Sequence, residues 1–163
     1  MTTRAIRVAD EVWIATALLQ CEHSDREDFS VSEIVGRAQR ENVNKSVTLR
    51  PSVRAHAVQH CVANRPASPG RYRMLVETAR GRRRLYTPLD RSHRDRVSGK
   101  CVPRREEIPE EYHRLLDWYE QHFAVAGPAT SCDPILSLRG LGKEIWADED
   151  PDEYVRRVRE GWI

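Results

Sequence analysis

The spacing of apolar residues changes from a helical to a strand period near residue 71. Before that point, apolar side chains recur at helical spacing in residues 11–22, 31–40 and 51–63. After it, Tyr72, Met74 and Val76 fall on one face of a predicted antiparallel strand. The first half of the chain is therefore expected to form three short helices followed by strands.

A hairpin is predicted directly after this strand. Gly81 can adopt the positive φ angle of a tight turn, and residues 82–86 can pair back onto the first strand. Three helices followed by a hairpin is the order of elements in a winged helix-turn-helix domain. We therefore expect a mainly α fold with a β-hairpin, in the form of a winged helix, over residues 1–88.

Residues at the predicted helix starts support these assignments. Asp10 suits the N-cap of the first helix, and Ser30 with Glu33 forms a capping-box pattern for the second. Pro51 suits the first turn of the third helix, where a missing amide donor costs nothing.

The second part of the chain divides differently. Residues 89–108 hold few apolar and many basic residues, so we expect a basic linker or arm, extended or irregular. Residues 109–124 are predicted to form a fourth helix that serves packing or dimerisation. Residues 125–163 are predicted to form an acidic tail, extended or in short helices, that binds a partner.

The net charge of +2 conceals an asymmetric distribution. Residues 1–105 hold 21 Lys and Arg against 11 Asp and Glu, whereas residues 106–163 hold 6 against 14. The basic excess is concentrated in residues 71–105, with 12 basic and 3 acidic residues. Such a division predicts two halves with different partners, and the basic half favours a polyanion such as DNA.

The third helix and the hairpin supply the predicted DNA contacts. The second helix of a helix-turn-helix pair enters the major groove, so Ser52, His56 and Gln59 are expected to face base edges. The residues expected on phosphates or in the minor groove are Arg50, Arg54, Arg71, Arg73, Arg80, Arg82, Arg83 and Arg84. If about six phosphates are neutralised, log K should fall with log salt at a slope of roughly −5. A solvated charged face or an acidic protein partner is the alternative interpretation.

Three short motifs stand out in this half: QHCVAN at residues 59–64, GRYR at 70–73 and RGRRRLY at 80–86. Together they resemble a winged-helix module of prokaryotic restriction and defence-associated proteins. The resemblance covers about residues 10–88. It implies DNA binding and brings no catalytic residues with it.

The acidic tail contains DPILSLRGLGKEIW at residues 133–146 and DEDPDEYVRR at 148–157. These strings resemble the C-terminal tail of antitoxins that neutralise PIN-domain ribonuclease toxins. The resemblance implies that a DNA-binding domain represses the operon while the tail wraps the toxin. The side chains expected to contact the partner are Leu136, Leu138, Arg139, Leu141, Ile145, Trp146, Tyr154, Val158 and Trp162.

These observations predict a DNA-binding transcriptional regulator, the antitoxin of a type II toxin–antitoxin pair. The alternatives are a DNA-recognition or adaptor subunit of a restriction or defence system, and a stand-alone winged-helix repressor. The predicted partners are double-stranded DNA and a protein bound by the tail, with a homodimer also possible.

Other functional classes lack the residues they need. We find no Ser/His/Asp or Cys/His set, phosphate loop or dinucleotide motif, so neither an enzyme nor a cofactor is expected. His56 and His60 have no second ligand pair at typical spacing, so no metal is expected. No stretch reaches the roughly 18 apolar residues of a membrane span, and the chain start has no apolar signal core, so we expect a cytoplasmic location.

Overall fold

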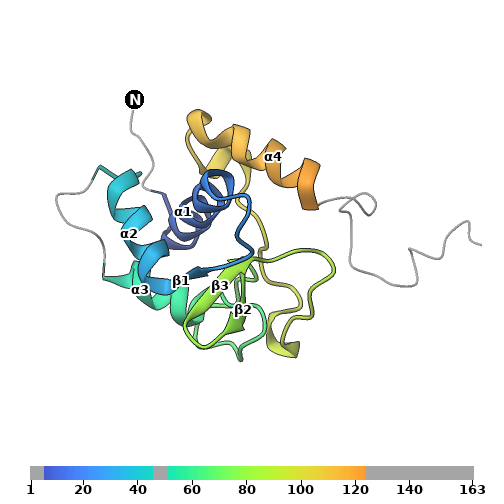
Figure 1. Ribbon diagram of the computed structural model, residues 1–163. Coiled ribbons are helices and arrows are strands. Elements are labelled where there is room, and N and C mark those ends of the chain that lie inside the picture. Colours follow the sequence, from blue (N-terminus) through green and yellow to red (C-terminus); the bar gives the residue numbers. More distant parts are fainter. Residues whose placement is uncertain (1–5, 46–50, 124–163) are drawn as a thin grey trace, which may run out of the picture. The chain divides into compact units, whose positions relative to one another are not determined.

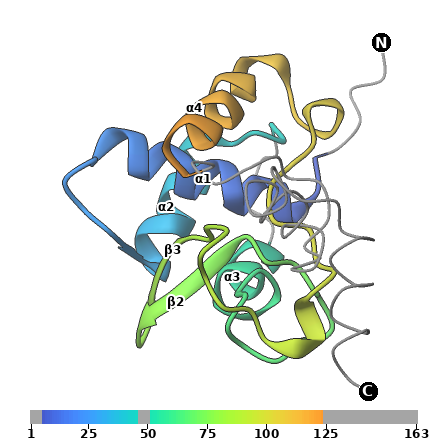
Figure 2. The ribbon, with the colours of Figure 1, turned by 90° about the vertical axis from the view of Figure 1, so that its right-hand side faces the viewer.

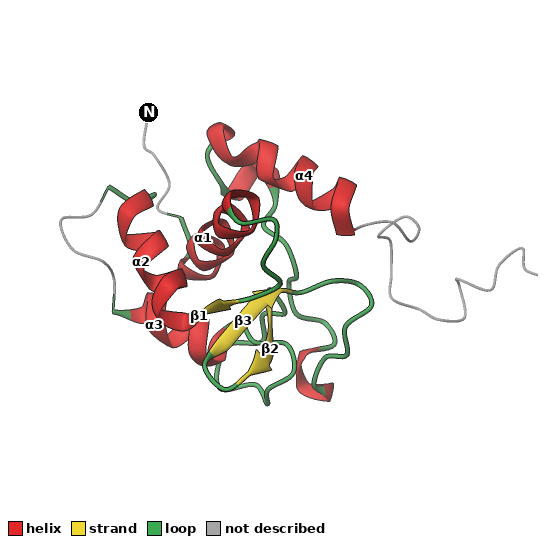
Figure 3. Cartoon of the chain, in the orientation of Figure 1, coloured by secondary structure: helices red, strands yellow, loops and turns green. Residues whose placement is uncertain are grey.

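The computed structural model describes residues 6–45 and 51–123. Its helices and strands are, in chain order, α1 (Val8–Glu22), β1 (Phe29–Ser30), α2 (Val31–Glu41), α3 (Ser52–Ala55), β2 (Leu75–Ala79), β3 (Arg82–Leu85) and α4 (His113–Phe123). A π-helical turn, His56–His60, continues α3, and 3-10 turns form at Arg94–Arg96, Arg105–Glu107 and Glu110–Tyr112. The result is a mixed fold of helices and one small antiparallel sheet (Figures 1 and 3).

Helix α1 forms the centre of this fold. Every residue from Ala9 to Leu19 is buried, because other elements cover the helix on all sides. Figures 1 and 2 show α4 crossing on one side of α1, with the sheet and α3 on the other. The ring of Trp13 packs edge-on against Tyr119 of α4, with 5.8 Å between ring centroids. The core therefore joins the fourth helix to the first three.

Asp10 does not cap α1, so this prediction was wrong. The helix begins at Val8, two residues before it, and Asp10 is fully buried inside the helix. Its carboxylate oxygen Oδ1 lies 2.6 Å from Lys100 Nζ. The sequence pattern missed this because the partner of Asp10 lies 90 residues further along the chain.

Helix α2 begins as the sequence predicts. Ser30 Oγ accepts a hydrogen bond from the Glu33 amide at 3.2 Å, and Glu33 Oε2 accepts one from the Ser30 amide at 2.8 Å. This is a complete capping box. Asn42, in the left-handed conformation, ends the helix.

The third helix is shorter than the predicted 51–63. After α3 the backbone follows the π-helical pattern, in which hydrogen bonds span five residues instead of four. The Cys61 amide thus donates to the His56 carbonyl at 3.0 Å. Cys61 then leaves the helix, and its own carbonyl accepts a hydrogen bond from the Leu75 amide at 2.9 Å. Pairing with the chain at the start of β2 thus ends the helix early.

The sheet contains the predicted hairpin and one strand that the sequence did not reveal. β2 and β3 pair across Gly81, whose φ angle of 76° confirms the predicted turn. β1, only two residues long, pairs with β3, which gives the strand order β1-β3-β2. The Val31 amide also bonds to the Gly81 carbonyl at 2.9 Å. The turn of the hairpin is therefore fastened to the start of α2.

Residues 89–108 are irregular, but they pack onto the domain and do not extend from it. The His93 amide bonds to the Ala63 carbonyl at 2.7 Å, and the Arg73 amide bonds to the Lys100 carbonyl at 2.8 Å. At Gly99 the chain passes so close to residue 71 that an added Cβ would lie 1.7 Å from the Arg71 carbonyl oxygen. The segment is therefore part of the folded domain.

The predicted apolar stripe of the fourth helix lies in the core. Tyr112, Leu115, Leu116 and Tyr119 are all buried there. They share one buried apolar cluster with residues of α1. Within the described ranges, no helix is both long and apolar enough to cross a bilayer.

Candidate nucleic-acid interface

The residues predicted to read bases are partly engaged within the domain. Ser52 is half-buried in the first turn of α3. His56 Nδ1 lies 2.9 Å from the Ser52 carbonyl oxygen, and the His56 ring packs edge-on against His60. The Gln59 side-chain amide donates to the Pro66 carbonyl at 3.0 Å. Gln59 would have to release this bond before it could pair with a base.

The first and last arginines of β3 are each paired with a carboxylate from outside the hairpin. Arg82 Nε lies 2.7 Å from Asp28 Oδ1, and Arg84 Nη1 lies 2.7 Å from Asp90 Oδ2. Hydrogen bonds from Arg82 and Thr78 lower the pKa of Asp28 below its ordinary value. Asp28 comes from a distant part of the chain, so the sequence did not reveal the pairing of Arg82, whereas Asp90 lies only six residues after Arg84.

Arg83 is not at an exposed hairpin tip, which corrects the prediction for this residue. Its exposed fraction is 1%, because strand alternation turns it inward. Its guanidinium donates to the Ala57 carbonyl at 3.2 Å and the Val58 carbonyl at 3.1 Å. It also pairs with Glu77 Oε1 at 3.1 Å. Arg83 therefore joins β3 to the π-helical turn and is closed to a phosphate.

Arg96 is a structural residue that sequence reasoning missed. Its exposed fraction is 0%, and its guanidinium donates to five backbone carbonyls at 2.7 to 3.0 Å. The accepting residues are Gln59, His60, Arg65, Pro66 and Tyr72. Burial lowers the pKa of this guanidinium. In sequence Arg96 looks like any other residue of a basic segment, so only the folded chain distinguishes it.

Arg73 is also partly engaged. Its Nε donates to the Gly99 carbonyl at 3.0 Å, and its guanidinium lies 5.5 Å from the centroid of the Tyr86 ring. It is half-buried, so it helps to hold residues 89–108 against the sheet.

A smaller set of predicted contact residues remains open to solvent. Arg54 on α3, Arg71 before β2 and Arg80 in the hairpin turn are exposed, as is Arg91 in the following loop. Within the described part of the chain, no ion pair or side-chain hydrogen bond involves these four guanidinium groups. On α3, the hairpin and the adjoining loops, these four groups are available to an external anion.

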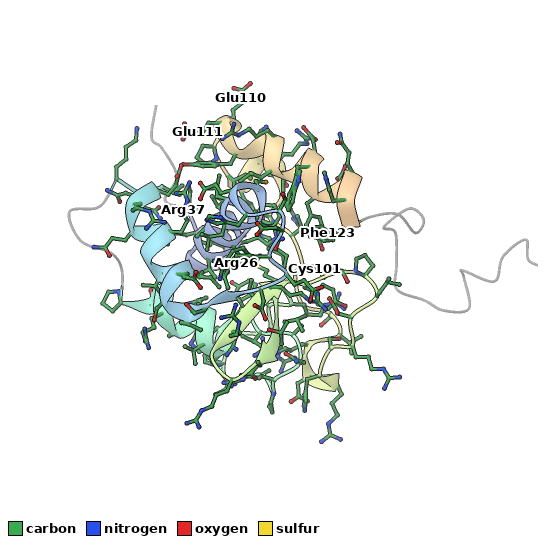
Figure 4. All side chains as sticks on the ribbon, in the orientation of Figure 1. Arg26, Arg37, Cys101, Glu110, Glu111 and Phe123 are labelled. Carbon is green, nitrogen blue, oxygen red and sulfur yellow. The ribbon has the colours of Figure 1, made fainter. Side chains whose placement is uncertain are left out.

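Acidic side chains gather at another part of the domain. Figure 4 shows Glu110 and Glu111, both exposed, at the start of the α4 region and away from the sheet. Arg26 and Arg37, labelled in the same view, are already paired: Arg26 with Glu33 at 2.8 Å, and Arg37 with Glu22 at 2.8 Å. Two further arginines, Arg40 on α2 and Arg114 on α4, are exposed and form no ion pair within the described residues, so free positive charge is not confined to the side of the sheet.

Two groups of predictions concern residues that the structure does not describe. They are Arg50 in the DNA-contact set and the whole partner-binding set, Leu136, Leu138, Arg139, Leu141, Ile145, Trp146, Tyr154, Val158 and Trp162. Among the described residues, no group of three or more His, Cys, Asp or Glu side chains could hold a metal ion.

Comparison with family models, curated protein sequences and solved structures gave no match. The residues of the chain itself therefore carry the functional inference.

Proposed function

We propose that this protein is a DNA-binding transcriptional regulator whose described domain is a winged helix. The order of three helices and a hairpin supports this assignment, and so does the fastening of the hairpin turn to α2. The observation that carries it is the set of four exposed arginines without internal partners: Arg54, Arg71, Arg80 and Arg91. A duplex offers a dense line of phosphates to such groups.

The folded domain offers fewer free charges than its sequence suggests. Arg82, Arg83 and Arg84 are neutralised internally, and Arg96 is buried. If the four free arginines each neutralise one phosphate, log K should fall with log salt at a slope of roughly −3.6. This slope is shallower than the slope of roughly −5 that neutralisation of about six phosphates would give.

Binding of the full chain to a duplex tests this proposal. Fluorescence anisotropy would be measured over a range of salt concentrations with the DNA upstream of its own gene and with a scrambled duplex of equal length. Arg54→Ala and Arg80→Ala should each reduce the salt slope by about 0.9. Arg114→Ala, which removes an exposed arginine from α4, is the matched control and should leave the slope unchanged. Absence of duplex binding at low salt would refute the proposal.

We further propose that residues 125–163 bind a protein, and that this partner is a PIN-type ribonuclease toxin. The string at residues 133–157 supports this second part of the proposal. Co-expression with the neighbouring open reading frame is the test. Toxicity relieved by the full chain, and not by a Trp146→Ala and Trp162→Ala double variant, would support it.

The identity of the co-purifying protein separates the alternatives. A small ribonuclease supports the antitoxin assignment, whereas a large nuclease or helicase supports an adaptor of a restriction or defence system. If no protein co-purifies and no toxicity is relieved, the chain is a stand-alone repressor and the toxin-binding proposal is wrong.

A further inference from the structure

The loop that follows β3 displays two large apolar side chains to solvent. Leu89 is 88% exposed and Val97 is 56% exposed, and these are the exposed large apolar residues of the described chain. Both belong to the segment 88–97, here called the display loop. A single exposed leucine is ordinary on a protein surface. Leu89 differs from such a residue because hydrogen bonds hold the turn around it in place.

The turn that carries Leu89 is fixed by several hydrogen bonds. The Asp90 amide bonds to the Thr87 carbonyl at 3.0 Å, which closes the turn around Pro88 and Leu89. The Asp90 carboxylate accepts the Thr87 amide at 2.7 Å and the Thr87 hydroxyl at 2.9 Å. Arg84 binds the same carboxylate from β3. The turn is thus tied to the sheet while its apolar tip stays outside the core.

The other end of the display loop is equally well anchored. Arg96 is buried among the five carbonyls described above, and the His93 amide bonds to the Ala63 carbonyl at 2.7 Å. With both ends fixed, most of the conformational entropy of the loop is already lost in the free protein. A partner that takes up Leu89 would therefore face a small ordering cost.

The charges of the loop indicate the kind of partner. Arg91 is exposed, and the Arg94 side chain is 91% exposed, 3.8 Å from Asp95 at its closest charged contact. Asp90 is occupied by Arg84 and Thr87. Leu89 is thus followed by two exposed guanidinium groups, Arg91 without an ion pair and Arg94 with one 3.8 Å contact to Asp95. Proteins that insert an apolar wedge between base pairs from the minor groove combine the same two kinds of side chain. The two arginines favour a polyanion over a purely apolar protein surface.

We propose that the display loop is a second DNA contact, in which Leu89 inserts as a wedge into the minor groove and Arg91 and Arg94 hold the adjacent phosphates. This inference rests on the proposed DNA binding and adds a deformation of the duplex to it. Insertion of an apolar side chain partly unstacks a base step and kinks the duplex by about 20–90°. The domain would therefore bend the DNA that it binds.

The test uses the full chain and a duplex of about 30 base pairs carrying a donor and an acceptor fluorophore at its ends. Anisotropy measures affinity, and energy transfer in the saturated complex measures bending. Wild type should raise energy transfer. Leu89→Ala should lower affinity about tenfold and abolish the rise in energy transfer. Arg91→Ala should lower affinity and the salt slope, yet leave some bending in the saturated complex.

Gln121→Ala, an exposed substitution on α4, is the matched control and should behave as wild type in both measurements. Because Leu89 is exposed, its replacement should also leave the thermal unfolding midpoint unchanged. If Leu89→Ala binds and bends the duplex as wild type does, the inference is overturned. This holds also if the variant loses a co-purifying protein, because Leu89 would then contact that protein and not DNA. Binding by wild type without bending overturns it as well. If wild type does not bind a duplex at all, the proposed function itself is wrong.

Discussion

The Arg96 guanidinium lies 2.7 Å from the carbonyl oxygen of His60, the last residue of the π-helical turn. A helix end leaves carbonyl groups without intrahelical partners, and a buried end needs donors from elsewhere. Arg96 supplies them from a segment 36 residues further along the chain. The proposed recognition helix therefore depends for its C-terminal end on residues beyond the hairpin.

Replacing Arg96 should destabilise the domain strongly. Arg96→Met leaves buried carbonyls without donors, which should lower the free energy of unfolding by about 3 kcal/mol or more. Arg96→Lys retains some donors and should fall between Arg96→Met and wild type. Urea denaturation measures the effect. Arg94→Ala, at a side chain 91% exposed, is the control and should change stability by less than about 0.5 kcal/mol. Equal stability of Arg96→Met and wild type would contradict the assigned role.

Replacing Arg80 should affect DNA binding, whereas replacing Arg83 should affect the stability of the domain. Arg83→Ala removes a guanidinium that is 99% buried and bound to carbonyls, so it should cost about 3 kcal/mol of unfolding free energy. Arg80→Ala removes an exposed group and should weaken duplex binding with little change in stability. Paired denaturation and anisotropy measurements on both variants check this. The reverse pattern would mean that the pairing of Arg83 is not structural.

Release of Arg82 should strengthen DNA binding. Asp28→Asn removes the charge that holds Arg82, which lies beside the hairpin turn. With one more free guanidinium, the slope of log K against log salt should steepen by about 0.9. Glu120→Gln, an equal charge change at an exposed site on α4, serves as the control. An unchanged slope for Asp28→Asn would mean that Arg82 does not reach a phosphate.

Protonation of Glu33 should make the domain less stable in acid. A hydrogen bond from Arg26, together with the Ser30 amide, holds the pKa of Glu33 at about 2 instead of 4.5. Because the folded-state pKa is depressed, this contribution is fully present above pH 4.5 and is lost as pH falls toward 2. Unfolding free energies between pH 5 and 2 should therefore fall less steeply for Glu33→Gln than for wild type. Parallel curves of unfolding free energy against pH for the two proteins would contradict this role of Glu33.

Two glycines should respond to alanine in opposite directions. Gly36 lies in α2 with nothing within 4 Å of an added Cβ, so Gly36→Ala should stabilise the protein by about 0.5–1 kcal/mol. At Gly99 the added Cβ would overlap the Arg71 carbonyl, so Gly99→Ala should cost more than about 2 kcal/mol. Thermal or urea unfolding measures both. A neutral Gly99→Ala would show that the loop can move away from residue 71.

Local patterns in the sequence determined the start of α2, the hairpin turn at Gly81 and the apolar stripe of α4. Each depends on residues within a few positions of one another: the Ser30 and Glu33 capping box, a glycine with positive φ, and helical spacing. The sequence also showed where the basic residues are concentrated.

Tertiary structure decided which of those charges are free. Asp28 reaches Arg82 across 54 residues and Lys100 reaches Asp10 across 90, and no local pattern encodes such pairs. Other long-range contacts created β1, shortened the third helix and buried Arg83 and Arg96. The physical reason is that a charge is neutralised by the opposite charges that the fold brings within a few ångströms. A charge count along the sequence compares only residues that are close in the chain.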